Sequence, residues 1–149
     1  MATGTRTGRK ATFASADQAR GILDRVLARI NDDDTAGPLL RATGMRLRLN
    51  CPDLGLAVNI AASRDPDSHI EWTFDERPGW EPRLELTMSS AVANAYLQGR
   101  ASVPVAIARG EIRCSGDARA ALRYLPAAKL IAEPYRELLA AEYPDLVVG

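Results

Sequence analysis

Apolar and polar residues recur with two different periods along the stretch 83–126, and each change of period marks the end of an element. Residues 84–88 (LELTM) alternate, the pattern of a strand with one buried face. Ser89 or Ser90 suits the N-cap of the next element. Its apolar residues recur at helical spacing until Gly99, which suits a helix C-terminus. A strand followed directly by a helix is therefore predicted.

The rest of this stretch predicts a short helix, a second strand and a further helix. Pro104 suits the first turn of the short helix, and Gly110 suits its C-terminal cap. Residues 111–115 return to strand alternation. The helix that follows is expected to end at Pro126, because proline lacks the N–H that a helix interior needs.

The N-terminal part predicts two helices. Ser15 and Gln18 stand three residues apart as a capping box, and apolar residues over 19–30 recur at helical spacing. Residues 35–43 predict a short second helix whose Leu39-Leu40 pair docks on the core. An amphipathic helix and a short companion therefore precede the first strand.

Three alternating segments, 45–51, 56–60 and 70–75, predict an antiparallel meander, because only short polar links join them. Beyond Pro126, the segments 127–133 and 135–141 predict two helices with a hinge at the intervening proline. The order of elements favours an α+β fold. Its sheet needs a helical cover on the apolar face, since a bare sheet of this composition is unstable in water.

Composition narrows the function classes. The 149 residues fit one domain, expected over 15–149 behind a flexible basic tail at 1–14. The 19 basic and 19 acidic residues balance, so nucleic acid and anionic membrane have no evident electrostatic attraction to the chain. The excess of arginine over lysine fits coding bias in a GC-rich genome. No apolar run long enough to span a bilayer occurs, and a cytoplasmic protein without membrane insertion is expected.

Candidate catalytic and metal-binding groups are few. Cys51 and Cys114 fall on the apolar side of predicted strands and are expected to be reduced core thiols. His69 is the single histidine and is expected at the surface, which leaves little basis for a catalytic triad. The run 32–34 (DDD) lacks the spacing of a calcium loop and predicts a solvated turn. We therefore expect no enzyme activity, no metal and no cofactor.

Three motifs in fixed order carry a resemblance to a known family. They are 84–89 (LELTMS), 96–100 (YLQGR) and 108–117 (ARGEIRCSGD). With these motifs, the region from about Arg46 to Pro126 resembles the lipid-binding domain of sterol carrier proteins. The resemblance implies a five-stranded, mostly antiparallel sheet packed by helices. It also implies an apolar tunnel for sterols, fatty acids or acyl-CoA esters.

Non-catalytic binding or transfer of an apolar lipid is the leading hypothesis for function. An apolar ligand gains about 25 cal/mol for each Å² removed from water, so an unfilled interior suffices for binding. Arg100 or Arg109 is a candidate for holding a polar head group. The residues expected to face the tunnel, from the strand pattern and the resemblance, are Trp72, Phe74, Met88, Tyr96, Leu97, Ile107, Leu122 and Leu125.

Two alternatives remain open at this point. The same fold without a ligand is the first: a scaffold or interaction module that forms a homodimer or supports an enzyme, with a filled interior. An enzyme acting on a lipid or CoA ester is the second, and it requires a polar group that points into the apolar interior. Solid packing beneath the sheet favours the scaffold, because a lipid then has no space to enter.

Overall fold

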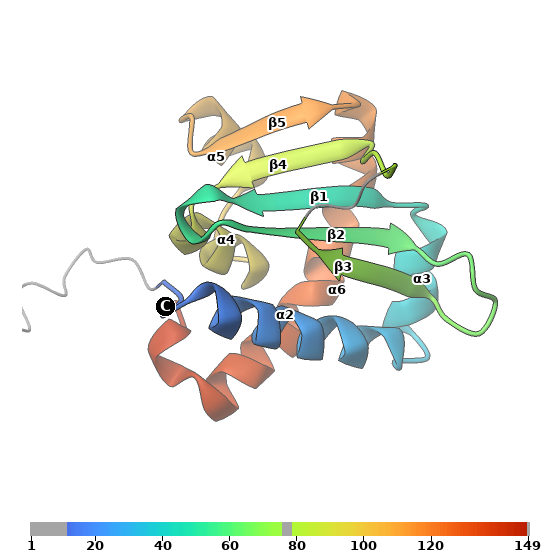
Figure 1. Ribbon diagram of the computed structural model, residues 1–149, viewed down its shortest axis with the longest axis horizontal. Coiled ribbons are helices and arrows are strands. Elements are labelled where there is room, and N and C mark those ends of the chain that lie inside the picture. The colour runs from blue at the N-terminus through green and yellow to red at the C-terminus, as the bar shows by residue number, and fades with distance from the viewer. Residues whose placement is uncertain (1–11, 76–78, 149) are drawn as a thin grey trace, which may run out of the picture.

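The computed structural model describes residues 12–75 and 79–148, apart from the side chains of residues 118, 125 and 126. A five-stranded sheet forms one layer, and helices cover one of its faces (Figure 1). The elements in chain order are α2 (Ala16–Asn31), α3 (Ala36–Ala42), β1 (Arg46–Cys51), η1 (Pro52–Leu54), β2 (Leu56–Ala62), β3 (Ile70–Phe74), β4 (Leu84–Met88), α4 (Ser90–Leu97), α5 (Val103–Ala108), β5 (Ile112–Gly116), α6 (Ala118–Glu142) and η2 (Pro144–Leu146).

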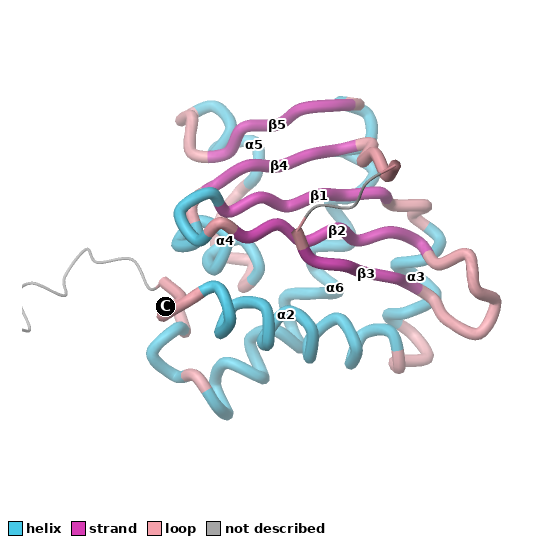
Figure 2. Tube along the Cα trace, in the orientation of Figure 1, coloured by secondary structure: helices cyan, strands magenta, loops and turns pink. Residues whose placement is uncertain are grey.

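The strands lie in the order β3-β2-β1-β4-β5. Strands β1, β2 and β3 form the antiparallel meander that the sequence predicts. After β3 the chain crosses to the other side of β1, so β4 pairs with β1 in parallel, and β5 then pairs with β4 antiparallel. The predicted α+β fold with a mostly antiparallel sheet is confirmed (Figure 2).

The two faces of the sheet differ in chemistry. Leu47 and Leu49 of β1 are buried against the helices, as are the apolar residues of β4. On the opposite face the loop before β4 brings Trp80 over the guanidinium groups of Arg46 and Arg48, 5.0 and 5.5 Å from the ring centroid. Aromatic stacking on cations therefore covers part of the face that the sequence predicts to be wet.

The start of α2 follows the predicted capping pattern. The Ser15 side chain accepts a hydrogen bond from the Gln18 N–H, and the Gln18 side chain accepts one from the Ala14 N–H. Phe13 is buried in the core, so residues 12–14 belong to the folded domain. The remainder of the expected tail, residues 1–11, lies outside the described residues.

Helix α3 corrects one expectation about docking. Leu40 is fully buried, whereas Leu39 is 51% exposed. Consecutive residues of a helix point about 100° apart, so a short helix on a surface buries one leucine of such a pair. The prediction that both leucines dock on the core is wrong for Leu39.

Helix α6 corrects a larger expectation. It runs without interruption over Ala118–Glu142, so neither Pro126 nor Pro134 ends it. An internal proline removes one backbone hydrogen bond and costs about 3 kcal/mol. The buried residues Ile131, Tyr135 and Leu139 repeat every four positions and dock this helix in the core. Packing of this face outweighs the local cost of the prolines.

A buried polar cluster attaches the C-terminal segment to the helices. The Asn94 and Gln98 side-chain amides both donate to the Leu146 carbonyl, and the Gln98 side-chain oxygen accepts from the Val148 N–H. Tyr135 donates its hydroxyl hydrogen to the Asn94 side-chain oxygen over 2.7 Å. Because the three side chains are fully buried and bonded, they hold residues 146–148 in one place.

The structure revises the expected places of two candidate chemical groups. Cys51 is buried as expected, but Cys114 is exposed because β5 lies at the edge of the sheet. His69 is half-buried, and its ring lies so close to Gly37 that a Cβ there would meet it at 2.5 Å. Neither the exposed thiol of Cys114 nor the partly covered ring of His69 matches its predicted environment.

The described residues contain neither a membrane-spanning helix nor a cluster of metal ligands. No helix in ranges 12–75 and 79–148 combines the length and apolar character needed to cross a bilayer. Within the same ranges, no three histidine, cysteine or acidic side chains gather as a metal site would require.

Candidate functional site

An open groove lies between α4, α5 and α6. Its volume is about 390 Å³, within the range of about 300–1,000 Å³ that is typical of ligand pockets. Tyr96 and Gly99 contribute from the end of α4, and Val103 and Pro104 from the start of α5. The remaining lining residues are Ala101, Ser102, Ala128, Lys129, Ala132 and Arg136.

The groove owes its floor to small residues on one face of α6. Ala128, Ala132 and Arg136 are spaced four apart, so they lie one above the other along the helix. Gly99, with φ +74°, turns the chain after α4 so closely that an added Cβ would meet the Arg136 guanidinium at 3.3 Å. Alanine and glycine keep α4 and α6 close while they leave a channel between them.

A second, smaller space lies directly beneath β1 and β4. It has a volume of about 20 Å³, about the size of one water molecule. Its lining is apolar apart from the hydroxyls of two tyrosines, and consists of Met45, Leu47, Leu84, Leu86, Tyr96, Val103, Ala121, Tyr124, Ala127, Ala128 and Ile131. The space is too small for a hydrocarbon chain in this conformation, so it differs from the open tunnel that was expected.

Three residues separate the groove from the small space. Tyr96, Val103 and Ala128 line both of them. Tyr96 and Val103 are therefore the large side chains that lie between the open groove and the apolar space beneath the sheet. The two spaces are therefore neighbours in the fold, with these three residues between them.

Two basic side chains stand at the groove. Lys129 is exposed, and Arg136 is half-buried with its Nη1 group donating to the Gln98 carbonyl over 2.7 Å. Neither forms an ion pair with a carboxylate of the described residues. A bound anion could therefore take hydrogen bonds from both without displacing an acidic partner.

The tyrosine at the boundary is a neutral polar group. Burial raises the pKa of Tyr96 above its ordinary value of 10.0. The phenol therefore stays protonated at neutral pH and can donate a hydrogen bond. Ser102, the N-cap of α5, uses its side-chain oxygen to accept from the Val105 N–H.

The predicted ligand-binding residues are scattered over the molecule. Tyr96 is the one that lines both the groove and the small space. Met88 and Leu97 are buried in the core without lining either. Trp72 and Phe74 lie on β3, at the far edge of the sheet, where Trp72 donates to Asp24 and Phe74 lies 5.6 Å from the Arg20 guanidinium carbon.

Ile107 and Leu122 correct the expectation that they face the interior. Ile107 is 39% exposed and Leu122 is 69% exposed. The buried face of α6 passes through Ala120 and Tyr124, and a residue midway between them points to the opposite side of the helix. Leu125 lies in the same helix, and its side chain lies outside the described part of the structure.

Sequence reasoning missed the groove residues of α6. Ala128, Ala132 and Arg136 are spaced four apart in the sequence, which is the signal that could have found them. The predicted break at Pro134 assigned Arg136 to a different helix, so the three residues were not expected to share a face. The arginines suggested for a head group, Arg100 and Arg109, are exposed and line neither the groove nor the small space. The basic side chains that line the groove are Lys129 and Arg136.

Comparison of the whole chain with known proteins finds likeness in structure alone. No protein-family model matches, and no curated protein sequence matches. A crystal structure of sterol carrier protein 2 matches with a TM-score of 0.53 and 19% identity over 78% of this chain and 95% of its own. This chain has the sterol carrier protein fold.

Further solved structures agree on that fold. The UbiJ-SCP2 ubiquinone synthesis protein matches with a TM-score of 0.56 and 15% identity, over 73% of this chain and 87% of its own. Domain 2 of the Helicoverpa armigera sterol carrier protein matches with a TM-score of 0.52 and 14% identity, over 76% and 86% of the two chains. The sec-alkylsulfatase Pisa1 from Pseudomonas matches over 60% of this chain, with a TM-score of 0.48 and 13% identity. The match covers 13% of the length of Pisa1.

Proposed function

We propose that this protein binds an apolar lipid with an anionic head group, such as a fatty acid or an acyl-CoA ester, in the groove between α4, α5 and α6. The observation that carries the proposal is the groove itself. It combines a floor of small and apolar side chains with two basic groups, and it adjoins apolar space beneath the sheet. The sterol carrier protein fold supports the binding of an apolar lipid in general.

The proposed binding mode follows from the basic and the apolar side chains that line the groove. The anionic head lies at Lys129 and Arg136, where charge-assisted hydrogen bonds fix its position. The chain lies along Val103 and Ala128 and gains about 0.8 kcal/mol for each methylene group that leaves water. Rotation of Tyr96 then admits the end of the chain beneath β1 and β4.

Titration with a fluorescent fatty acid tests the proposal. Saturable binding is expected for the native chain and is expected to vanish in Ala128→Trp, because the indole would fill the boundary between the two spaces. Ala57→Trp is the matched control, since Ala57 is also half-buried but lies on the opposite face of the sheet. Absence of saturable binding to the native chain would overturn the proposal.

A second titration tests the role of the charges. Lys129→Ala is expected to weaken binding of the fatty acid about tenfold or less, as expected when one exposed charge interaction is lost. Binding of the corresponding methyl ester, which has no negative charge, is expected to change little. Equal weakening for both ligands would contradict the proposed place of the head group.

The small volume beneath the sheet favours a second candidate function. A space of about 20 Å³ resembles an ordinary packing defect, so a ligand-free interaction module of the same fold is consistent with it. That candidate predicts no saturable lipid binding. It also predicts that the tagged native chain, used as bait, recovers a specific protein partner. The tagged Ala128→Trp chain is then expected to recover the same amount of that partner.

A further inference from the structure

Strand β5 forms an open edge of the sheet. It is the last strand in the order, and within the described ranges 12–75 and 79–148 no strand pairs with its outer side (Figure 1). The opposite edge, β3, is flanked by α2, with a hydrogen bond from Trp72 to Asp24 between them. An uncovered edge presents backbone donors and acceptors that can pair with another strand.

The hydrogen-bond pattern shows which groups face outward. The Asp117 N–H donates to the Arg83 carbonyl, in line with the β4–β5 register. Because antiparallel residues alternate, the backbone groups of Arg113 and Ser115 then point toward β4. Those of Ile112, Cys114 and Gly116 point to the open edge, which gives three N–H groups and three carbonyls for a further strand.

Exposed side chains beside β5 favour an occupant with apolar character. Cys114 is exposed on the helix-facing side of the strand. Helix α5, which packs against β5, exposes Val105 by 47% and Ile107 by 39%. Helix α6 begins directly after β5 and exposes Leu122 by 69%. A partner that covers these side chains would remove apolar surface from water, which favours association.

We propose that β5 pairs with β5 of a second copy of this chain, antiparallel, about a two-fold axis at Cys114. This inference does not depend on the proposed lipid binding. In this register Ile112 pairs with the partner's Gly116, and the two Cys114 residues lie opposite each other. All the outward backbone groups of Ile112–Gly116 are then satisfied within the strand.

Side-chain charges are consistent with this register. It places the partner's Arg113 opposite Ser115, which pairs with Glu85 of β4. Glu85 accepts a hydrogen bond from Asn50 and lies 3.6 Å from Arg48, so the partner's guanidinium would share this carboxylate with them. A shift by one residue, with the axis at Arg113, would set two arginines directly opposite each other, which is unfavourable. Beyond the strand the chain leaves the pairing plane, because Glu111 bonds to the Ala106 carbonyl and Asp117 caps α6.

Oxidative cross-linking tests the register. Directly opposite residues of a hydrogen-bonded antiparallel pair have Cα atoms about 5.5 Å apart, within the range that a disulfide spans. Copper phenanthroline is expected to convert the native chain, and Cys51→Ser, to a disulfide-linked dimer at low protein concentration. Cys114→Ser is expected to stay unlinked. Failure of both Cys114-containing chains to cross-link would contradict an axis at this residue.

Sedimentation equilibrium tests the dimer itself. The native chain is expected to dimerise, and Cys114→Pro to be monomeric, because proline removes an outward N–H that β4 does not use. Arg113→Glu cannot fail through the core, since Arg113 is exposed. It is expected to weaken the dimer about tenfold.

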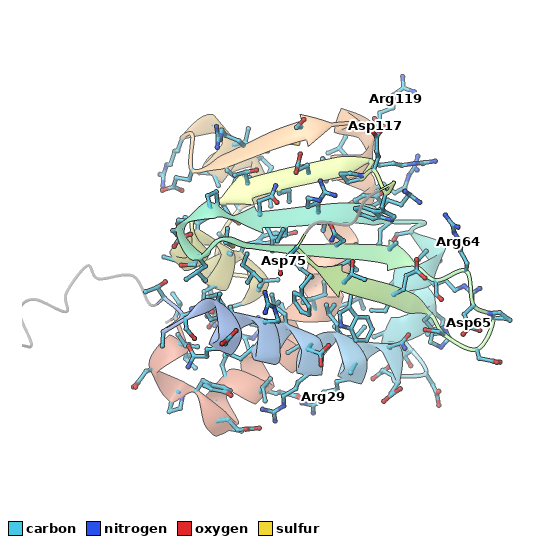
Figure 3. All side chains as sticks on the ribbon, in the orientation of Figure 1. Arg29, Arg64, Asp65, Asp75, Asp117 and Arg119 are labelled. Carbon is cyan, nitrogen blue, oxygen red and sulfur yellow. The ribbon has the colours of Figure 1, made fainter. Side chains whose placement is uncertain are left out.

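Arg64→Glu is the matched control, an exposed arginine in the loop between β2 and β3, far from β5 (Figure 3). It is expected to leave the dimer unchanged. A native chain that stays monomeric up to its solubility limit would overturn the proposal, as would equal weakening by Arg64→Glu and Arg113→Glu. A monomer that captures a strand from another protein would also overturn self-pairing.

Discussion

At the residue scale, two glycines occupy opposite environments. Gly116 has φ +109°, and an added Cβ would lie 2.3 Å from the Arg83 carbonyl oxygen. Gly21 lies inside α2 with nothing within 4 Å of an added Cβ. Gly116 is therefore required by the backbone where β5 meets β4, whereas Gly21 weakens its helix.

Alanine substitution at both positions is the first prediction. Gly116→Ala is expected to lower the free energy of unfolding by about 1–3 kcal/mol, because of backbone strain and the close carbonyl. Gly21→Ala is expected to raise it by about 0.5–1 kcal/mol, because alanine favours a helix interior. Urea unfolding of the two variants checks both signs, and a neutral Gly116→Ala would contradict the tight junction.

Cys51 gives the second prediction. Burial, with a smaller effect from the negative charge of Asp53, raises its pKa from 9.0 to about 12. Below pH 9 the thiol is protonated in both the folded and unfolded chains. As pH rises from 9 toward 12, only the unfolded chain ionises, so the free energy of unfolding falls, with a slope of up to about 1.4 kcal/mol per pH unit from this group.

Unfolding measured in urea between about pH 8 and about pH 11 checks this dependence, because that range spans the ordinary thiol pKa and stays below the folded one. Cys51→Ala is expected to reduce the slope, even though its stability at neutral pH is lower. At pH 8, a thiol reagent is expected to modify the exposed Cys114 and to spare Cys51. An unchanged slope in Cys51→Ala would show that other groups cause the loss.

Local sequence patterns were sufficient for several residues but not for others. Ser15 and Ser89 could be recognised as caps, because capping depends on neighbours in the chain. Asn59 could not be placed, since it lies on the face predicted to be wet and yet is fully buried. Its side chain bonds to Arg48 and to the Asp75 carbonyl, contacts that only the folded sheet creates.

At the element scale, α6 shows how packing overrides a local signal. Pro134 lies inside the helix, where an alanine would restore a backbone hydrogen bond. The third prediction is that Pro134→Ala raises the free energy of unfolding by about 2 kcal/mol. Alanine stabilises the helix interior relative to proline, but it also gives the unfolded chain more conformational freedom, which offsets part of that gain.

Thermal and urea unfolding check the sign for Pro134→Ala, and Pro144→Ala is its control, because Pro144 starts the short helix η2, where no such bond is missing. Little change is expected there. A loss of stability in Pro134→Ala would mean that the proline helps to position Tyr135 and Leu139 in the core. The sequence pattern predicted the wrong end for α6 because the continuity of this helix depends on its packing against the rest of the core.

At the scale of the whole molecule, ligand binding and stability are linked. A lipid that binds only the folded chain is expected to raise its free energy of unfolding by about 2.7 kcal/mol at a concentration of 100 Kd. This is the fourth prediction, and fatty acid and its methyl ester at matched saturation should give the same rise. Unfolding with and without ligand checks it.

The control for ligand linkage is Ala128→Trp, which blocks the boundary between the groove and the small space. Its unfolding is expected to be insensitive to fatty acid. An equal rise in the native chain and in this variant would place the lipid elsewhere on the molecule.

The sequence by itself determined the strands, the helices before α6, the meander and the fold class, because alternation, helical spacing and caps depend on near neighbours. Tertiary structure alone decided that β4 lies parallel to β1, that α6 is continuous, and that Lys129 and Arg136 meet Tyr96 at one groove. These features depend on contacts between distant segments. Local patterns record which side of an element is apolar, but not which other element will cover it.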